Sequence, residues 1–201
     1  GGLHCVNVTN PLVPVIAGTY SIDGYIHENM TIHYNGPDVE HIGKQVSFNF
    51  HTGSPDRVTI VDVTDKSDLD RISTANYVGG NLCHQGWVTE DHGYLLMNDE
   101  GDETSTGNNT RTHIFNIQDL DAPVHLGYFQ GPNASSDHNL YMHRNLAWES
   151  NYTSGLQVLD ATNVAPASLS LCAYFDTYPA NNNNGYNGAW GNYPFFASGI
   201  V

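Results

Sequence analysis

The stretch Arg57–Tyr77 reads RVTIVDVTDKSDLDRISTANY and decides the fold, because three further segments share its layout. Each segment starts with a short apolar strand, passes through Asp or Asn into a polar turn, and ends with a second strand that closes on an aromatic residue. The other segments are Gly2–Tyr20, Thr112–Phe129 and Gly155–Phe175. Their marker residues are Asn7, Asp62, Asn116 and Asp160, which are 55, 54 and 44 residues apart. Repeats of this length made of short strands are typical of β-propeller blades.

A second pattern alternates with the first, because a histidine stands at the start of a strand before the later repeats. His27, His84 and His138 hold these places, at spacings of 57 and 54 residues. No stretch keeps apolar residues at the i, i+3, i+4 and i+7 positions of an amphipathic helix, so helical repeats are excluded. The sequence therefore predicts an all-β fold, a β-propeller of about four blade equivalents.

We expect one domain over residues 1–201, with a half-blade, three full blades and a half-blade. The predicted full blades are about 25–77, 83–129 and 137–175, and the predicted half-blades are 1–20 and 188–201. Half-blades leave unpaired strand edges, which recruit partners. The two halves could pair with each other, the chain could be a fragment of a larger propeller, or neighbouring chains could complete the blades. The last alternative predicts self-association through the terminal half-blades, in rings or filaments.

The charge balance excludes several classes of partner. The 201 residues contain 6 Lys+Arg and 21 Asp+Glu, so the net charge is −15 with neutral histidines. Such a chain cannot follow a phosphate backbone, and nucleic-acid binding is not expected. No apolar run is long enough to span a membrane. The first residues show neither an initiator Met nor a signal peptide, which predicts a processed or cropped product.

Five Asn-x-Ser/Thr sequons favour an extracellular, secreted or cell-surface glycoprotein carrying N-linked glycans. They are Asn7, Asn29, Asn108, Asn133 and Asn151. A structural role in a turn competes with glycosylation at Asn7 and Asn151. The three cysteines, Cys5, Cys83 and Cys172, allow one disulfide whose pairing the sequence leaves unknown, or serve as small buried apolar residues.

Several longer stretches carry a family resemblance. The most specific are His84–His92 (HQGWVTEDH) and Gly188–Gly199 (GAWGNYPFFASG), with Asp23–His27 (DGYIH) and Phe175–Pro179 (FDTYP) in support. In these stretches the chain resembles the choice-of-anchor B family, built from LVIVD-type propeller repeats, and is similar to its C-terminal portion. The resemblance implies a β-propeller displayed outside the cell and brings no established reaction. It also implies cysteines where this chain has Thr31 and Ser47.

The three repeated histidines are the first candidate metal site. Equivalent positions on the innermost strands of successive blades face one central channel. Imidazoles from His27, His84 and His138 could there hold Zn, Cu or Fe, with Trp190 near the fourth equivalent position. The alternative is that each histidine hydrogen-bonds to a neighbouring blade and keeps the repeats in register.

The acidic run Asn98–Glu103 is the second candidate site. Asp99, Glu100, Asp102 and Glu103 place four carboxylates in a predicted loop with a turn-forming glycine, which suits Ca²⁺. The alternative is a solvated acidic turn.

From these features we expect a secreted, N-glycosylated propeller that acts as a non-enzymatic extracellular structural or adhesive module, polymerising by completion of blades between chains. The second interpretation is a metal- or glycan-binding propeller with glycan ligands. The third is a hydrolase-type enzyme, in which Glu90 would pair with Asp99 or Asp137 as in glycosidases.

Overall fold

The computed structural model describes residues 1–53 and 55–201. In this part of the chain, fourteen strands form four antiparallel sheets. The first sheet has only β1 (Leu3–Asn7) and β2 (Val15–Tyr20). The second contains β3 (Glu28–His33), β4 (Gln45–His51), β5 (Arg57–Asp62) and β6 (Asp70–Asn76).

The remaining two sheets also have four strands each. The third contains β7 (Cys83–Val88), β8 (Tyr94–Asp99), β9 (Arg111–Asn116) and β10 (Val124–Gln130). The fourth contains β11 (Leu140–His143), β12 (Leu146–Ser150), β13 (Leu156–Asp160) and β14 (Ser170–Phe175). Two short helices complete the description: the 3-10 helix η1 (Val39–His41) and α1 (Asp102–Thr106).

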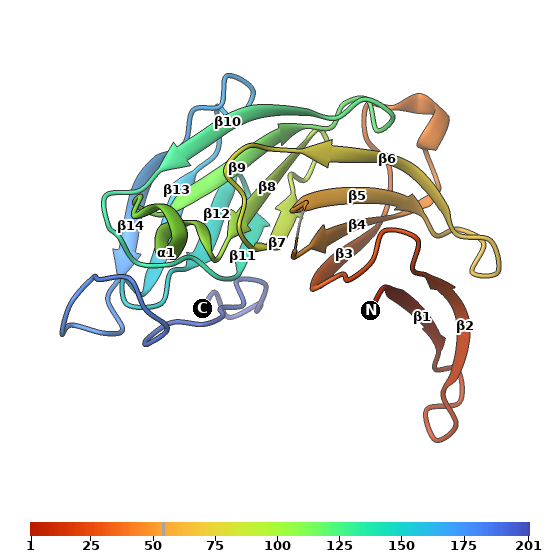
Figure 1. The fold of residues 1–201 in the computed structure, drawn as a ribbon, viewed down its shortest axis with the longest axis horizontal. Coiled ribbons are helices and arrows are strands. Elements are labelled where there is room, and N and C mark those ends of the chain that lie inside the picture. The colour runs from red at the N-terminus through yellow and green to blue at the C-terminus, as the bar shows by residue number, and fades with distance from the viewer. Residues whose placement is uncertain (54) are drawn as a thin grey trace.

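The sheets stand side by side in an arc, with β3, β7 and β11 on its inner side and β6 and β10 outside (Figure 1). Strand β7 contacts both β3 and β11. Each four-stranded sheet is a simple antiparallel meander. This architecture confirms the predicted all-β, propeller-like fold.

Strand β8 shows why the middle sheet is apolar on both faces. Side chains alternate between the faces of a strand. Leu95 and Met97 therefore join a buried cluster with the second sheet, whereas Leu96 joins a different buried cluster with the fourth sheet. The run YLLM is continuous in the sequence because sheets pack against both faces of this one.

The predicted half-blade at 188–201 differs from the structure. Among the described residues this segment forms no strand, and only an isolated bridge joins Ala189 to Tyr152. Pro194 has no N–H to give to a strand ladder, and Gly188 has a positive φ of 99°. A Cβ on Gly188 would lie 2.2 Å from the carbonyl oxygen of Tyr152. The segment instead packs Phe195 against the inner strands.

The half-blade at the other end is present as β1 and β2. Several apolar side chains are exposed on this hairpin: Val6, Val8, Leu12, Val13, Val15 and Ile16. Self-association through the terminal half-blades stays a prediction.

The acidic run does not form the expected loop. Asn98 and Asp99 end β8, and α1 begins at Asp102. Gly107 ends this helix with a φ of 72° in the left-handed region, which suits glycine. The run is therefore folded and largely buried rather than solvated.

The cysteines are all free: Cys83 is buried, Cys5 is half-buried and Cys172 is exposed. Thr31 and Ser47 lie opposite each other on β3 and β4, with a hydrogen bond of 3.1 Å between their hydroxyl groups. A polar pair thus bridges these two strands. Within the described residues, no helix has the length and apolar character needed to cross a membrane.

Candidate functional site

The structure brings the three repeated histidines together at the inner ends of three sheets. His84 lies in β7, His27 directly precedes β3, and His138 lies two residues before the start of β11. The ring centroids are 4.7 Å apart for His27 and His84, and 4.1 Å apart for His84 and His138. The repeat in the sequence therefore becomes a stack of imidazoles around one channel.

Glu100 also points into this channel, although the sequence placed it with the acidic run. Its Oε2 lies 3.7 Å from His84 Nε2, and its Oε1 lies 3.9 Å from His138 Nε2. One ligand atom from each of the three side chains falls within 4.8 Å of the others. The strand pairing brings the two residues to the same end of the sheet: β7 and β8 are antiparallel, Asp99 lies opposite Cys83, and a bulge between Cys83 and Gln85 places His84 beside the position from which Glu100 continues.

Aromatic side chains wall the site. The cavity has a volume of about 390 Å³ and is lined by His27, His84, Glu100, His138, Tyr152, Tyr186 and Trp190. The Tyr152 hydroxyl donates a 2.5 Å hydrogen bond to Glu100 Oε1 and so fixes this carboxylate.

Trp190 holds His138 from two directions. His138 Nδ1 donates to the backbone oxygen of Trp190 at 2.6 Å, and the Trp190 indole N–H donates to His138 Nε2. This arrangement assigns the proton of neutral His138 to Nδ1 and leaves the Nε2 lone pair facing the channel wall. The alternative prediction, that the histidines hold neighbouring parts of the fold together by hydrogen bonds, also remains open, because His138 connects the fourth sheet to the C-terminal segment.

Burial keeps His84 and His138 uncharged. Burial, together with the neighbouring His138 and His27, lowers the pKa of His84 to about 3. Burial likewise lowers the pKa of His138 to about 4. The pKa of Glu100 is raised, chiefly by burial. Neutral imidazoles are the form that binds a metal, and His84 Nδ1 has no hydrogen-bond partner among the described residues.

The four carboxylates of the acidic run have different surroundings. Asp99 accepts hydrogen bonds from the Tyr77 hydroxyl and from the backbone of the loop that leads into β7. Asp102 pairs with Arg111, whose Nε lies 2.7 Å from Asp102 Oδ2. Glu100 faces the channel, and Glu103 is buried on another side. In the described part of the chain, no three of these carboxylates gather within 4.8 Å.

The glycosidase-like pair is not formed. Glu90 accepts a 2.9 Å hydrogen bond from the Arg144 backbone and lies near His143, beside the hairpin between β11 and β12. Asp99 and Asp137 are fully buried near the opposite end of β7. A six-residue strand of roughly 20 Å separates the two ends, which is more than two cooperating carboxylates allow.

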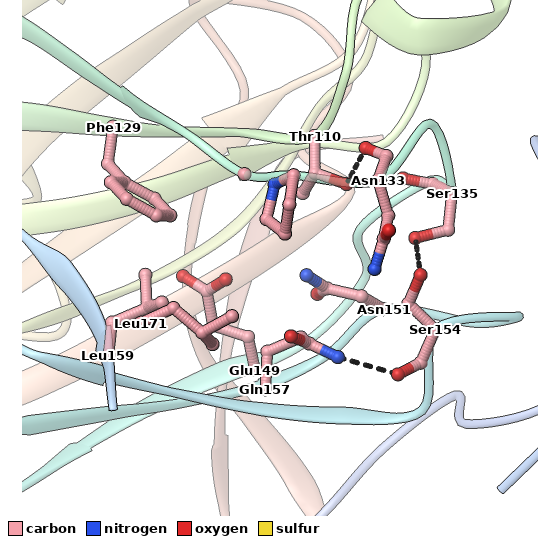
Figure 2. Close-up of a pocket in the computed structure, with 12 residues that line it drawn as sticks. Thr110, Phe129, Asn133, Ser135, Glu149, Asn151, Ser154, Gln157, Leu159 and Leu171 are labelled. Carbon is pink, nitrogen blue, oxygen red and sulfur yellow. Dashed lines mark hydrogen bonds between the residues drawn. The ribbon is translucent and has the colours of Figure 1, made fainter. Parts of the chain in front are cut away.

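A second cavity lies between the third and fourth sheets (Figure 2). Its volume is about 10 Å³, room for one water molecule and not for a substrate. Glu149 lines it, accepts a 2.8 Å hydrogen bond from Thr112, and has its pKa raised to about 7 by burial. Ser135 and Ser154 share a 2.7 Å hydrogen bond at the other end. The channel is therefore the larger and chemically richer site.

The predicted glycosylation sites differ in exposure. Asn7 and Asn29 are exposed, whereas Asn108 and Asn133 are half-buried. Asn151 is only 4% exposed, so the folded chain leaves no room for a glycan there. The prediction for Asn151 is corrected by its place in the small cavity (Figure 2).

No protein-family model matches the chain, and no curated protein matches it. Two solved structures are similar in fold. A periplasmic gluconolactonase of Pseudomonas aeruginosa has a TM-score of 0.50 and 15% identity, over 69% of this chain and 40% of that one. A protein from Lactobacillus plantarum has a TM-score of 0.58 and 15% identity, over 87% of this chain and 51% of that one.

These similarities support the propeller-like fold, and the chain spans about half the length of these structures or less. They contradict the prediction of a non-enzymatic structural or adhesive module, because one structure with this fold is a gluconolactonase. The same similarity contradicts the expectation of a chain without enzymatic activity, since a protein with this fold is an enzyme. The choice-of-anchor B resemblance has support only at the level of a propeller.

Proposed function

We propose that this chain is part of a hydrolase-type propeller whose reaction centre is the channel site. The observation that carries the proposal is the group of His84, Glu100 and His138, whose ligand atoms lie within 4.8 Å in an aromatic-walled cavity. The similarity in fold to a gluconolactonase supports a hydrolase over other reaction classes.

The residues fit a divalent transition metal. Two neutral imidazoles and one carboxylate are the ligand set of many catalytic zinc sites, which keep a further position open. The buried His84 Nδ1, unpartnered among the described residues, and the raised pKa of Glu100 both indicate a site that lacks a compensating charge. When bound, such a metal supplies Lewis acidity that activates water and polarises a carbonyl group.

The remaining side chains have separate tasks. Tyr152 orients Glu100 through its hydrogen bond, as an outer partner of a ligand does. His27 is exposed at the mouth of the channel, with its ring beside His84, and is placed to exchange a proton with solvent. The rings of Trp190 and Tyr186 offer flat apolar faces to a sugar-like ring.

The substrate class follows from these walls and from charge. A net charge of −15 disfavours the approach of anionic substrates such as sugar phosphates. A neutral, hydroxyl-rich lactone or related ester suits the cavity better.

The test is hydrolysis of D-glucono-1,5-lactone, followed with a pH indicator and corrected for the spontaneous reaction. The chain is stripped with a chelator and reloaded with Zn²⁺ or Mn²⁺. We expect reloading to restore the rate, and His84→Ala or Glu100→Gln to lower it at least a hundredfold. His33→Ala, at an exposed histidine outside the channel, is the matched control. The proposal would be contradicted if the stripped and reloaded proteins hydrolysed the lactone at equal rates. It would also be contradicted if both channel variants were as fast as the unmodified chain.

We also propose the finer features that the resemblance implies: membership of the choice-of-anchor B family and an extracellular location. N-linked glycans are proposed at Asn7, Asn29, Asn108 and Asn133. Mass spectrometry of the protein from its native source, before and after removal of N-glycans, tests these positions one by one. Binding of glycan ligands stays a prediction.

A further inference from the structure

A group of buried carboxylate oxygens lies where the start of α1 meets the segment that leads into β11. Glu103 is 1% exposed and Asp137 is 0% exposed. Both carboxylate oxygens of each residue have no hydrogen-bond partner within residues 1–53 and 55–201. Leaving two buried, charged carboxylates without donors costs several kcal/mol per charge, so either protons or a bound cation must neutralise them.

The two carboxylates come from segments that lie side by side. Thr104, next to Glu103, donates a hydrogen bond of 3.2 Å to Asn184 Oδ1. Ser136, next to Asp137, donates a hydrogen bond of 3.3 Å to the same oxygen atom. One amide oxygen therefore joins the start of α1 to the segment that leads into β11.

Asn98 gives an independent sign of a missing ligand. It is 0% exposed, and in the described structure neither its amide oxygen nor its amide nitrogen has a partner. Asn98 pairs with Thr112 across β8 and β9, so the two side chains share a face. The Thr112 hydroxyl donates to Glu149 of β12, which shows that this face looks toward the fourth sheet. Asn98 is thus a neutral oxygen donor aimed into the same interface.

The charges can be counted. Asp102 is balanced by Arg111 through contacts of 2.7 Å and 2.6 Å, although its Oδ1 remains unpartnered among the described residues. Glu103 and Asp137 are then left as two uncompensated negative charges. Burial raises the pKa of Glu103 to about 9, with Asp102 contributing, and the Asp137 carboxylate is fully buried with no hydrogen-bond donor among the described residues. The pair needs either two protons or one divalent cation.

We propose that a calcium ion binds at this interface, held by the carboxylates of Glu103 and Asp137. Asp102 Oδ1 and Asn98 Oδ1 are further oxygen ligands. An all-oxygen set with two excess negative charges selects a hard cation over the transition metals that suit the channel histidines. The carboxylates of Asp102, Glu103 and Asp137 do not yet gather within 4.8 Å. They rotate toward the ion as it binds, which the flexible coordination of Ca²⁺ permits.

The ion would join two sheets, so its binding should be visible as stability. A ligand present at a hundred times its Kd raises the Tm of a domain of this size by roughly 5 to 10 °C. We expect such a rise when Ca²⁺ is added to chelator-treated protein, and a much smaller one with Mg²⁺. Native mass spectrometry should show one Ca²⁺ per chain.

The variants Glu103→Gln and Asp137→Asn should abolish the Tm shift, because each replaces a carboxylate by a neutral amide of similar shape. Glu100→Gln, in the channel, and Asp121→Asn, in a partly exposed acidic group beside η1, are controls that should retain it. If the carboxyl variants do not fold, luminescence of Tb³⁺ bound to the unmodified chain, displaced by Ca²⁺, is the second measurement. No Tm shift and no bound ion would overturn the proposal and favour a protonated pair. A shift that survives in Glu103→Gln and Asp137→Asn would also overturn it.

Discussion

Replacing Asp99 with alanine tests how the channel is held in place. This carboxylate is fully buried and accepts hydrogen bonds from the Tyr77 hydroxyl at 2.6 Å and from the backbone N–H groups of Asn81, Leu82 and Gly101 at 3.0, 2.9 and 3.2 Å. It therefore fixes the loop that leads into β7 and the turn that carries Glu100.

Hydrogen bonds to a charged group contribute about 1.5 to 3 kcal/mol each, and their effects do not add fully. Removing all four hydrogen bonds at once should lower the free energy of unfolding by about 4 kcal/mol, a large part of a typical total of about 5 to 15 kcal/mol. Asp99→Asn keeps one acceptor oxygen and should cost about half as much. The expected fall in Tm for Asp99→Ala is roughly 8 to 16 °C.

Urea denaturation followed by tryptophan fluorescence measures the loss. Asp160→Ala is the matched control, because Asp160 is an aspartate at the end of β13 whose side chain accepts a backbone hydrogen bond from Thr162 in an exposed turn. It should change the midpoint little. If Asp99→Ala loses less than about 1 kcal/mol, the four bonds do not hold the loop, and the account of how Glu100 reaches the channel is wrong.

Three further predictions concern other parts of the molecule. Burial, with the neighbouring His113, lowers the pKa of His125 to about 4. As the pH drops, the unfolded chain therefore binds a proton at His125 before the folded chain does, and the free energy of unfolding should fall between about pH 6.5 and pH 4. His125→Gln should flatten that part of a curve of Tm against pH. Trp190→Phe removes the indole N–H that occupies His138 Nε2, so competition with a chromogenic chelator should show several-fold tighter Zn²⁺ binding; unchanged or weaker binding would count against the assigned ligand atom. Leu96→Ala should cost about 3 kcal/mol in urea denaturation because Leu96 is 0% exposed, whereas an exposed leucine, Leu12, should tolerate the same change.

The repeat pattern predicted the fold and the meeting of three histidines because both follow from periodicity. Equivalent positions in stacked sheets must converge on one axis, so His27, His84 and His138 could be placed without coordinates. Glu100 could not, since its place depends on the register between β7 and β8 and not on any repeat.

Other failures have local causes. The terminal segment has apolar and aromatic residues that suit strands, but Pro194 and the close approach of Gly188 to Tyr152 prevent a ladder. Asn151 carries a sequon, yet its side chain is used inside the protein. Sequons and strand propensities describe a few residues at a time, while burial is a property of the packed sheets.

Strand β8 lies between two separate hydrophobic cores and contributes side chains to both. Leu95 and Leu96 are joined by one peptide bond, yet Leu95 shares a core with Phe48, and Leu96 shares another with Leu159. Substitutions at residues without common contacts add independently, whereas those at residues in one core are coupled. The effects of substituting these two adjacent leucines on stability should therefore be nearly additive, whereas substitutions at residues that are far apart in the sequence but share a core should be coupled. A disturbance at one interface between sheets reaches the next through the backbone of β8 and through Trp87, which packs against both cores.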